Sequence, residues 1–399
     1  DTWDFDAAYE AAKDGDIIEF TPNLTMNFTR EPFTEITKNI TIIGHVEGNT
    51  FLNTITGKIR VSNKAKVTFQ NLWMSVLENN NMFRITGESE VTFENCVLQS
   101  EFPANEHFLL FSEEKSKVNF KQVTTKLPDK HQLGMKFVQS AVSIQDSTIQ
   151  NRLWIRENSE LTFVRSKMEC SRPTSLWIED SKLSILSSQV SGTFEGGTQA
   201  VLNASKSEIM IEDSLIQGVG KDYYTIYLQE SCTGVFNNLN VDFMKLKSSH
   251  IRMVNGSVKY NLAIDGESTL YSQGRLRFLN KESQHIPISL STNALFVGDS
   301  VEVEKETSSI IRVKEGSCFV VNDFIHLNGD ATKLNYETDE TSQCRITQKH
   351  KVAPERSEKG EIIRTEDAQK AHHSNTDYYA QLQGLIGLKT VKEKVDKLI

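Results

Sequence analysis

This sequence has few cysteines, no long apolar run and no histidines at metal-ligand spacing. Its 399 residues include five cysteines, an odd number without Cys-x-x-Cys spacing, which favours a reducing, cytoplasmic compartment. Cys96 and Cys318 are expected as small apolar residues of a β core. No run of 18 apolar residues occurs, so no membrane span is predicted. The nine histidines form no His-x-His or His-Glu-x-x-His pattern, and no metal site is predicted.

Positive charge is also in short supply. The chain has 44 Lys and Arg against 53 Asp and Glu, a net charge of −9. From Arg345 onward there are 11 basic and 8 acidic residues, so this tail carries +3 and the rest of the chain −12. Because nucleic-acid binding depends on neutralising phosphates, nucleic acid is not an expected partner. The same charge disfavours an intact polyuronate unless calcium bridges it to the protein.

What the sequence does contain is a short repeated phrase, in which two apolar residues flank one outward residue. Alternation of this kind is typical of a strand, and a similar phrase precedes it in each unit. The mean period is about 23 residues, a length expected of solenoid repeats. Stacked units bury one continuous core, so we predict an all-β fold, a parallel β-helix of about 13 rungs. One inward column is expected to hold Phe69, Phe93, Phe120, Ile144, Phe163, Ile185 and Ile211.

The turn after the second phrase supports this register. Asn, Asp and Gly tolerate left-handed backbone and stabilise turns. Such residues dominate the position two places after the last apolar residue of the phrase. This position holds Asn71, Asn95, Gln122, Asp146, Arg165, Ser187, Asp213, Asn237, Asn255, Gly274, Asp299 and Asp323. We therefore expect a ladder of stacked turns along one corner of the solenoid.

The N-terminus predicts a cap on the solenoid. Asp4 can begin a short helix that Gly15 ends, and residues 16–20 read as a first strand. The stretches Ala11–Ile18 (AAKDGDII) and Lys38–Gly44 (KNITIIG) resemble the opening of pectin-lyase-like right-handed β-helix proteins. The resemblance covers roughly residues 1–330 and implies a right-handed β-helix domain over 1–330. It implies a fold, and function must be argued from a site.

The C-terminal tail predicts two further parts. Residues 331–378 are polar and without strand rhythm, which is typical of a linker. In residues 379–399 the apolar residues Leu388, Val391, Val395 and Leu398 recur at helical spacing and predict an amphipathic helix. The segment Leu385–Ile399 (LIGLKTVKEKVDKLI) resembles the first helix of CbxX/CfqX-type AAA+ ATPases, whose domain would here be truncated. An ordinary amphipathic helix is the alternative.

The ATPase resemblance implies a nucleotide site beyond this fragment. In that family Ile386 and Gly387 would lie near the adenine. No Gly-x-x-x-x-Gly-Lys-[Ser/Thr] occurs, so the fragment itself is expected to bind no cofactor, while its longer parent would bind ATP and Mg²⁺. A hexamer is implied only through the missing ATPase domain.

The pectin-lyase-like resemblance also implies what an enzyme of that type would carry. Its calcium-dependent lyases use clustered carboxylates, and its hydrolases use motifs such as Asp-Asp, Gly-His-Gly and Arg-Ile-Lys, none of which occurs here. Asp146 and Asp213 share a turn register but lie three rungs apart, roughly 14 Å, so one calcium ion cannot bind both. We interpret them as turn residues and predict no catalytic residue.

Two hypotheses about function stay open. The first is a non-catalytic recognition or scaffold module of an AAA+ ATPase that remodels a protein partner. The second is a polysaccharide lyase or glycoside hydrolase, which should show two carboxylates within about 5–10 Å in a groove, or a calcium cage.

A candidate binding surface follows from the outward position of the first phrase. Six consecutive rungs there read as apolar or aromatic, with the indoles of Trp154 and Trp177 expected to stack. An apolar stripe of this length marks a surface that something covers. The predicted stripe is Leu110, Val138, Trp154, Trp177, Leu202 and Tyr227. Its occupant could be a protein partner, a glycan on the indoles, or the chain's own loops (101–108 or 127–135) or tail.

Overall fold

The chain forms about twelve turns of parallel β-solenoid with one short helix, so the predicted all-β fold class is confirmed. The computed structural model describes residues 5–28, 33–76, 82–100, 108–126, 134–170, 174–193, 200–219, 224–279, 285–304, 309–327, 335–351, 355–356 and 362–363. It divides into two compact units, Asp1–Ile251 and Arg252–Ile399. None of the described helices is long and apolar enough to cross a membrane.

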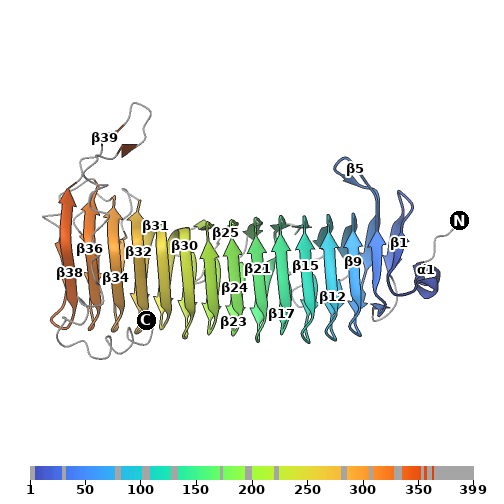
Figure 1. Ribbon diagram of the computed structural model, residues 1–399, viewed down its shortest axis with the longest axis horizontal. Coiled ribbons are helices and arrows are strands. Elements are labelled where there is room, and N and C mark those ends of the chain that lie inside the picture. Colours follow the sequence, from blue (N-terminus) through green and yellow to red (C-terminus); the bar gives the residue numbers. More distant parts are fainter. Residues whose placement is uncertain are drawn as a thin grey trace. The chain divides into compact units, whose positions relative to one another are not determined.

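In the N-terminal unit each turn contributes strands to three parallel ladders, whose members lie side by side in chain order (Figure 1). The first-strand ladder comprises β3 (Thr34–Ile36), β8 (Ile59–Val61), β11 (Phe83–Ile85), β14 (Leu110–Ser112), β17 (Gly134–Val138), β20 (Arg152–Arg156), β23 (Leu176–Glu179), β26 (Leu202–Ser205), β29 (Ile226–Gln229) and the end of β30 (Thr233–Lys247). The second-strand ladder comprises β1 (Asp16–Glu19), β4 (Ile40–Ile43), β9 (Lys66–Gln70), β12 (Glu90–Glu94), β15 (Lys117–Lys121), β18 (Ala141–Gln145), β21 (Glu160–Val164), β24 (Lys182–Leu186), β27 (Glu208–Glu212) and the start of β30.

The third-strand ladder closes each turn. It comprises β2 (Thr25–Phe28), β7 (Thr54–Gly57), β10 (Trp73–Val76), β13 (Val97–Ser100), β16 (Thr124–Lys126), β19 (Thr148–Ile149), β22 (Lys167–Cys170), β25 (Gln189–Thr193), β28 (Leu215–Val219) and the middle of β30. A small antiparallel pair, β5 (Val46–Glu47) and β6 (Thr50–Phe51), lies between β4 and β7 in the chain.

The core of this unit is formed by inward columns in register. The predicted column from Phe69 to Ile211 is confirmed, because its members are Cα partners from rung to rung and all are fully buried. The rings of Phe69, Phe93 and Phe120 stack with centroids 5.5 and 5.4 Å apart. Cys96 is buried as predicted, and burial raises the pKa of its thiol to about 12.

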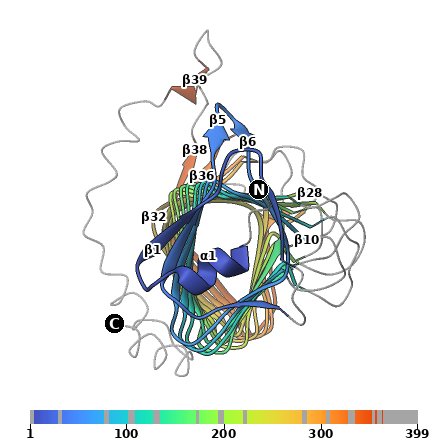
Figure 2. The same ribbon diagram turned by 90° about the vertical axis from the view of Figure 1, so that its right-hand side faces the viewer.

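A helix, α1 (Phe5–Ala11), lies across the end of the N-terminal unit (Figure 2). Phe5 and Tyr9 are buried, and the Phe5 ring meets the Phe28 ring edge-on at 4.5 Å. The helix ends before Gly15, whose φ of +92° suits a glycine. The Lys38 ammonium donates hydrogen bonds to the carbonyls of Tyr9 (2.7 Å) and Ala12 (3.0 Å) at the helix C-terminus. The predicted cap is confirmed, while Asp4 lies outside the described residues.

The predicted turn ladder is largely confirmed. Left-handed backbone occurs at nine of its positions: Asn71, Asn95, Gln122, Asp146, Arg165, Ser187, Asp213, Asn255 and Gly274. The prediction is wrong by one residue at Asn237, because Asn238 takes this conformation instead. It is also wrong at Asp299 and Asp323, which lie within the long strands β34 and β36 and show no positive φ.

The C-terminal unit has two ladders, and the strands of the second are longer than most in the N-terminal unit. One ladder is β31 (His250–Asp265), β33 (Ile288–Leu290), β35 (Ser309–Val313) and β37 (Asn335–Thr338). The other is β32 (Thr269–Phe278), β34 (Leu295–Val303), β36 (Cys318–His326) and β38 (Gln343–Lys351). A short antiparallel pair, β39 (Glu355–Arg356) and β40 (Ile362–Ile363), follows in the chain.

The predicted linker over 331–378 is therefore wrong in its first part. Residues 335–351 form β37 and β38, which pair in parallel with β35 and β36. These terminal strands are held by backbone hydrogen bonds to the preceding turn, and such pairing does not require apolar alternation. The predicted amphipathic helix over 379–399 lies outside the described residues.

Candidate binding surface

The outward residues of the first-strand ladder form a continuous row along the N-terminal unit. In this row aromatic and cationic side chains follow one another from rung to rung. We call it the first outer row: Glu35, Arg60, Arg84, Phe111, Lys136, Trp154, Trp177, Asn203, Tyr227 and Lys245.

The register corrects half of the predicted stripe. Leu110 and Leu202 are fully buried and point into the core, so their predicted outward placement is wrong. Phe111 and Asn203 take the outward places, as Cα partners of Arg84 and Trp177. A shift of one residue reverses the face of every side chain in a strand.

Val138 was also misplaced in the predicted stripe. It is the Cα partner of Arg156 and lies two residues from the row, where Lys136 pairs with Trp154. Trp154, Trp177 and Tyr227 are placed in the row as predicted.

The sequence contained a signal that gives the correct register at Phe111, although the same spacing is five positions at other rungs, as from Ala204 to Ile209. At this rung's neighbour, the first inward residue of the second strand, Val91, stands six positions after the last inward residue of the first strand, Ile85. The same count back from Val118 reaches Ser112 and so places Phe111 outward. Apolar content misled the prediction here, because the inward residue Ser112 is a fully buried serine and Leu109 is also buried.

Trp154 lies against its own chain. A Cβ atom built on Gly134 would come within 1.7 Å of the indole Cζ3, so the ring occupies the space that a side chain at Gly134 would need. Phe108 meets the indole edge-on, with ring centroids 5.4 Å apart and planes at 83°. The guanidinium of Arg152 lies 5.9 Å from the ring centroid. Trp154 is thus partly covered by the chain, through Phe108 of the predicted 101–108 loop.

Trp177, on the next rung, is the open member of the pair. Its side chain is 41% exposed, the most accessible of the large apolar side chains in the row. The predicted indole stack is not formed, since the described ring contact of Trp154 is with Phe108. Two rungs further on, Tyr227 packs beside Tyr224, with centroids 5.9 Å apart.

The cations of the row have two kinds of neighbour. At one end, Arg84 is bound by Glu113 at 2.8 Å, and Arg60 lies 3.8 Å from Glu35. Lys136 and Lys245 lie over aromatic rings, as the Arg84 guanidinium also does, 5.9 Å from the Phe111 centroid. The ammonium of Lys136 is 5.5 Å from the Phe111 centroid, and that of Lys245 is 5.6 Å from the Tyr227 centroid. Within the described residues neither lysine has an ion pair, so the row carries positive charge on an acidic chain.

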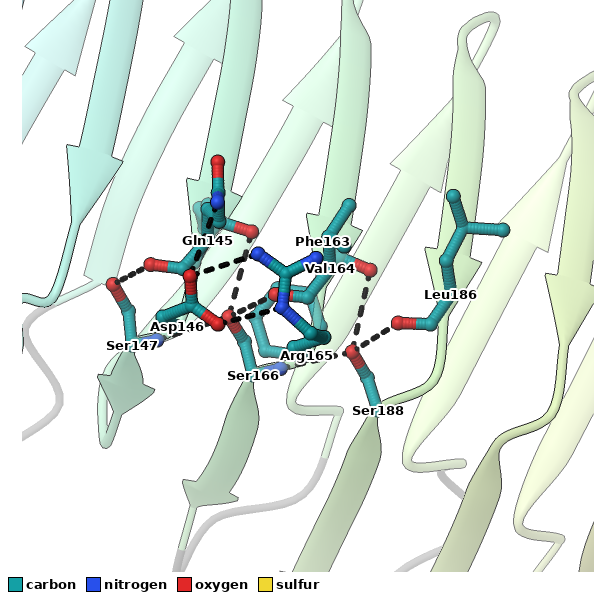
Figure 3. A network of polar contacts seen from close by, with 10 residues as sticks. Gln145, Asp146, Ser147, Phe163, Val164, Arg165, Ser166, Leu186 and Ser188 are labelled. Atoms are coloured by element: carbon teal, nitrogen blue, oxygen red, sulfur yellow. Dashed lines mark hydrogen bonds and ion pairs between the residues drawn. The ribbon is translucent and has the colours of Figure 1, made fainter.

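The corner after the second-strand ladder has a different chemistry, shown in Figure 3. Asp146 accepts two hydrogen bonds from the Arg165 guanidinium, at 2.8 and 2.9 Å. These bonds hold the pKa of the Asp146 carboxyl below its usual range. Asp213 accepts a hydrogen bond from the Asn238 amide at 2.8 Å. Both aspartates have positive φ, so the interpretation as turn residues is confirmed.

Behind this corner runs a buried column of serines (Figure 3). The Ser166 hydroxyl donates to the Val164 carbonyl at 2.7 Å and accepts from the Ser147 backbone N–H at 3.1 Å. The same pattern repeats one rung on at Ser188. A second serine column, which includes Ser159, lies at the corner before the second-strand ladder. These columns were not predicted, although serines recur in the sequence before most of the second strands, at Ser89, Ser116, Ser140, Ser159, Ser181 and Ser207.

Among the described residues, no group of three or more His, Cys, Asp and Glu side chains could hold a metal ion. The proposed adenine-proximal residues, Ile386 and Gly387, lie outside the described residues.

Comparison of the chain with known proteins found no match. No protein-family model, no curated protein and no solved structure matches the chain.

Proposed function

We propose that this chain is a non-catalytic recognition module that binds a partner on the first outer row. The observation that carries the proposal is the arrangement around Trp177, a 41% exposed indole between Trp154 and Asn203 on adjoining rungs. Isolated exposed apolar residues are ordinary, but a row of aromatic and cationic side chains in register is the composition of binding hot spots.

The scaffold suits such a role because it fixes the spacing of the row. Backbone pairing places successive outward residues about 4.8 Å apart. The serine columns add side-chain hydrogen bonds between consecutive turns, as from Ser147 to Ser166 and from Ser159 to Ser181. A preorganised surface loses little entropy on binding.

We further propose that this module belongs to an AAA+ ATPase that remodels a protein partner, with a right-handed, pectin-lyase-like β-helix as its recognition part. Support for the motor comes from the resemblance of Leu385–Ile399 to the first helix of CbxX/CfqX-type ATPases. ATP and Mg²⁺ would bind in the parent protein beyond this segment. ATP hydrolysis by a chain extended past Ile399 would test this half of the proposal, and an extension without a phosphate loop would refute it.

The recognition half is tested by photo-crosslinking. A photoreactive phenylalanine analogue replaces Trp177 in one variant and Thr162, on the second-strand ladder, in a matched control. We expect specific adducts at position 177 that disappear when Trp154→Ala is added, and none at position 162. Equal adducts at both positions, with no effect of Trp154→Ala, would mean that the first outer row is not a recognition surface.

A further inference from the structure

We infer that the ligand of the first outer row is an acidic peptide segment of a protein partner. Its apolar or aromatic side chains would pack at Trp154 and Trp177, and its carboxylates would meet Lys136 and Lys245. This inference rests on the proposed recognition function and adds to it the chemical class of the ligand.

The spacing of the row fits a short extended segment. Lys136 and Lys245 lie five rungs apart through the pairs that connect Trp154, Trp177, Asn203 and Tyr227. Five rungs correspond to roughly 24 Å, which an extended peptide spans with about seven residues. The four outward residues between the two lysines thus form a neutral, largely aromatic stretch with a cation at each end.

Charge complementarity gives the sign of the ligand. Three glutamates beside this ladder are each engaged by an arginine, Glu35 by Arg60, Glu113 by Arg84 and Glu179 by Arg156. Within the part of the chain that the structure describes, Lys136 and Lys245 have no acidic partner, so both can attract anions. Because residues 1–344 carry a net charge of −12, this part of the chain repels an acidic partner outside the row and favours its encounter with the row.

The surroundings of Trp154 favour a peptide over a ligand that binds by stacking flat rings. Gly134 and Phe108 both lie against the Trp154 indole, which reduces the face open to a sugar or base. Peptide side chains can instead use ring edges. On the rungs beyond Trp177, the Gln229 amide donates to the Asn203 side-chain oxygen at 3.4 Å. Amides of this kind can bond to the backbone of an extended peptide.

The experiment measures direct binding of a fluorescein-labelled (Glu-Tyr)₆ peptide by fluorescence anisotropy. We expect saturable binding that weakens as salt rises. The double variant Lys136→Glu, Lys245→Glu should weaken binding by about tenfold, because it replaces attraction at both ends by repulsion. Trp177→Ala should weaken it by a similar factor. Lys121→Glu, an exposed lysine on the second-strand ladder, should leave the affinity within about twofold.

Two further measurements separate the effect of charge from a loss of folding. Lys136→Gln with Lys245→Gln removes the charge conservatively, and circular dichroism establishes that every variant is folded. Absence of peptide binding, or equal affinity of the charge-reversed variant and the Lys121→Glu control, overturns the inference. Binding of hyaluronate in place of the peptide overturns it too but leaves the recognition function standing. If neither probe binds and crosslinking at position 177 also fails, the proposed function falls with it.

Discussion

Two ladders of the N-terminal unit share one core and differ in what they show to solvent. On the second-strand ladder the outward row is polar over six rungs: Thr68, Thr92, Asn119, Ser143, Thr162 and Ser184. On the first-strand ladder the same rungs present aromatic rings and cations. Inward residues are mostly apolar in both, as at Phe120 and Phe137. Burial therefore constrains one side of each strand, and the other side is free to carry function.

The largest effect is expected when a buried side chain of the shared core is truncated on each ladder. Phe120→Ala on the second-strand ladder and Phe137→Ala on the first-strand ladder each remove a fully buried ring. Each should lower the free energy of unfolding by ~3–5 kcal/mol through cavity formation. Ser143→Ala, an outward control, should change it by less than about 0.5 kcal/mol. Denaturant unfolding measures all three, and a loss below about 1 kcal/mol at Phe120 would mean that the inward assignment is wrong.

A smaller effect is expected at the corner that follows the second-strand ladder. Ser166→Ala removes the acceptor of the Ser147 N–H and the donor to the Val164 carbonyl. Leaving buried polar groups without partners should cost about 1–3 kcal/mol. Ser184→Ala, an outward serine nearby, is the matched control and should be close to neutral in the same unfolding measurement. Equal losses of unfolding free energy in the two variants would mean that the serine column does not stabilise the fold.

The next change affects the first-strand ladder alone. Gly134→Ala introduces a Cβ where the Trp154 indole lies, so the indole should swing outward at a cost of about 1 kcal/mol. We expect increased quenching of tryptophan fluorescence by acrylamide, together with weaker peptide binding. Unchanged quenching would mean that the backbone, and not the indole, makes room for the methyl group.

The smallest effect concerns pH. The Arg165 guanidinium lowers the pKa of the Asp146 carboxyl in the folded chain. The pair therefore stabilises the fold above the ordinary aspartate pKa of about 3.9, and this contribution is lost as pH falls through the lower folded value. Carboxyl carbon shifts followed by NMR should show Asp146 titrating at unusually low pH. Arg165→Gln should move its pKa upward, and a titration unaffected by this change would contradict the ion pair.

Much of the fold could be predicted from the sequence because parallel stacking repeats one local pattern. The column from Phe69 to Ile211 and the turn at Asn71 follow from alternation and from left-handed propensity, which are properties of neighbouring residues. The strands at 335–351 could not be predicted this way, since they are held by pairing to β35 and β36 and not by their own apolar pattern.

The candidate site was less predictable, because its members depend on which residues of each strand face outward. Trp154, Trp177 and Tyr227 were identified because an aromatic residue in the outward position stands out. Leu110 and Leu202 were misplaced because two apolar residues stand side by side there, and apolar character alone does not say which one faces the core.

The period, the inward column of the second strand and most turn positions follow from the amino-acid sequence alone, because burial and backbone conformation act within a few residues. Which side chains become neighbours between turns depends instead on how the folded strands pair. Lys136 beside Trp154, Phe108 against the indole and Gly134 beneath it come together through pairing of residues many positions apart. Over the six rungs predicted as apolar or aromatic, the row also contains Lys136 and Asn203, because the register of whole strands sets its members and a single-residue shift exchanges them.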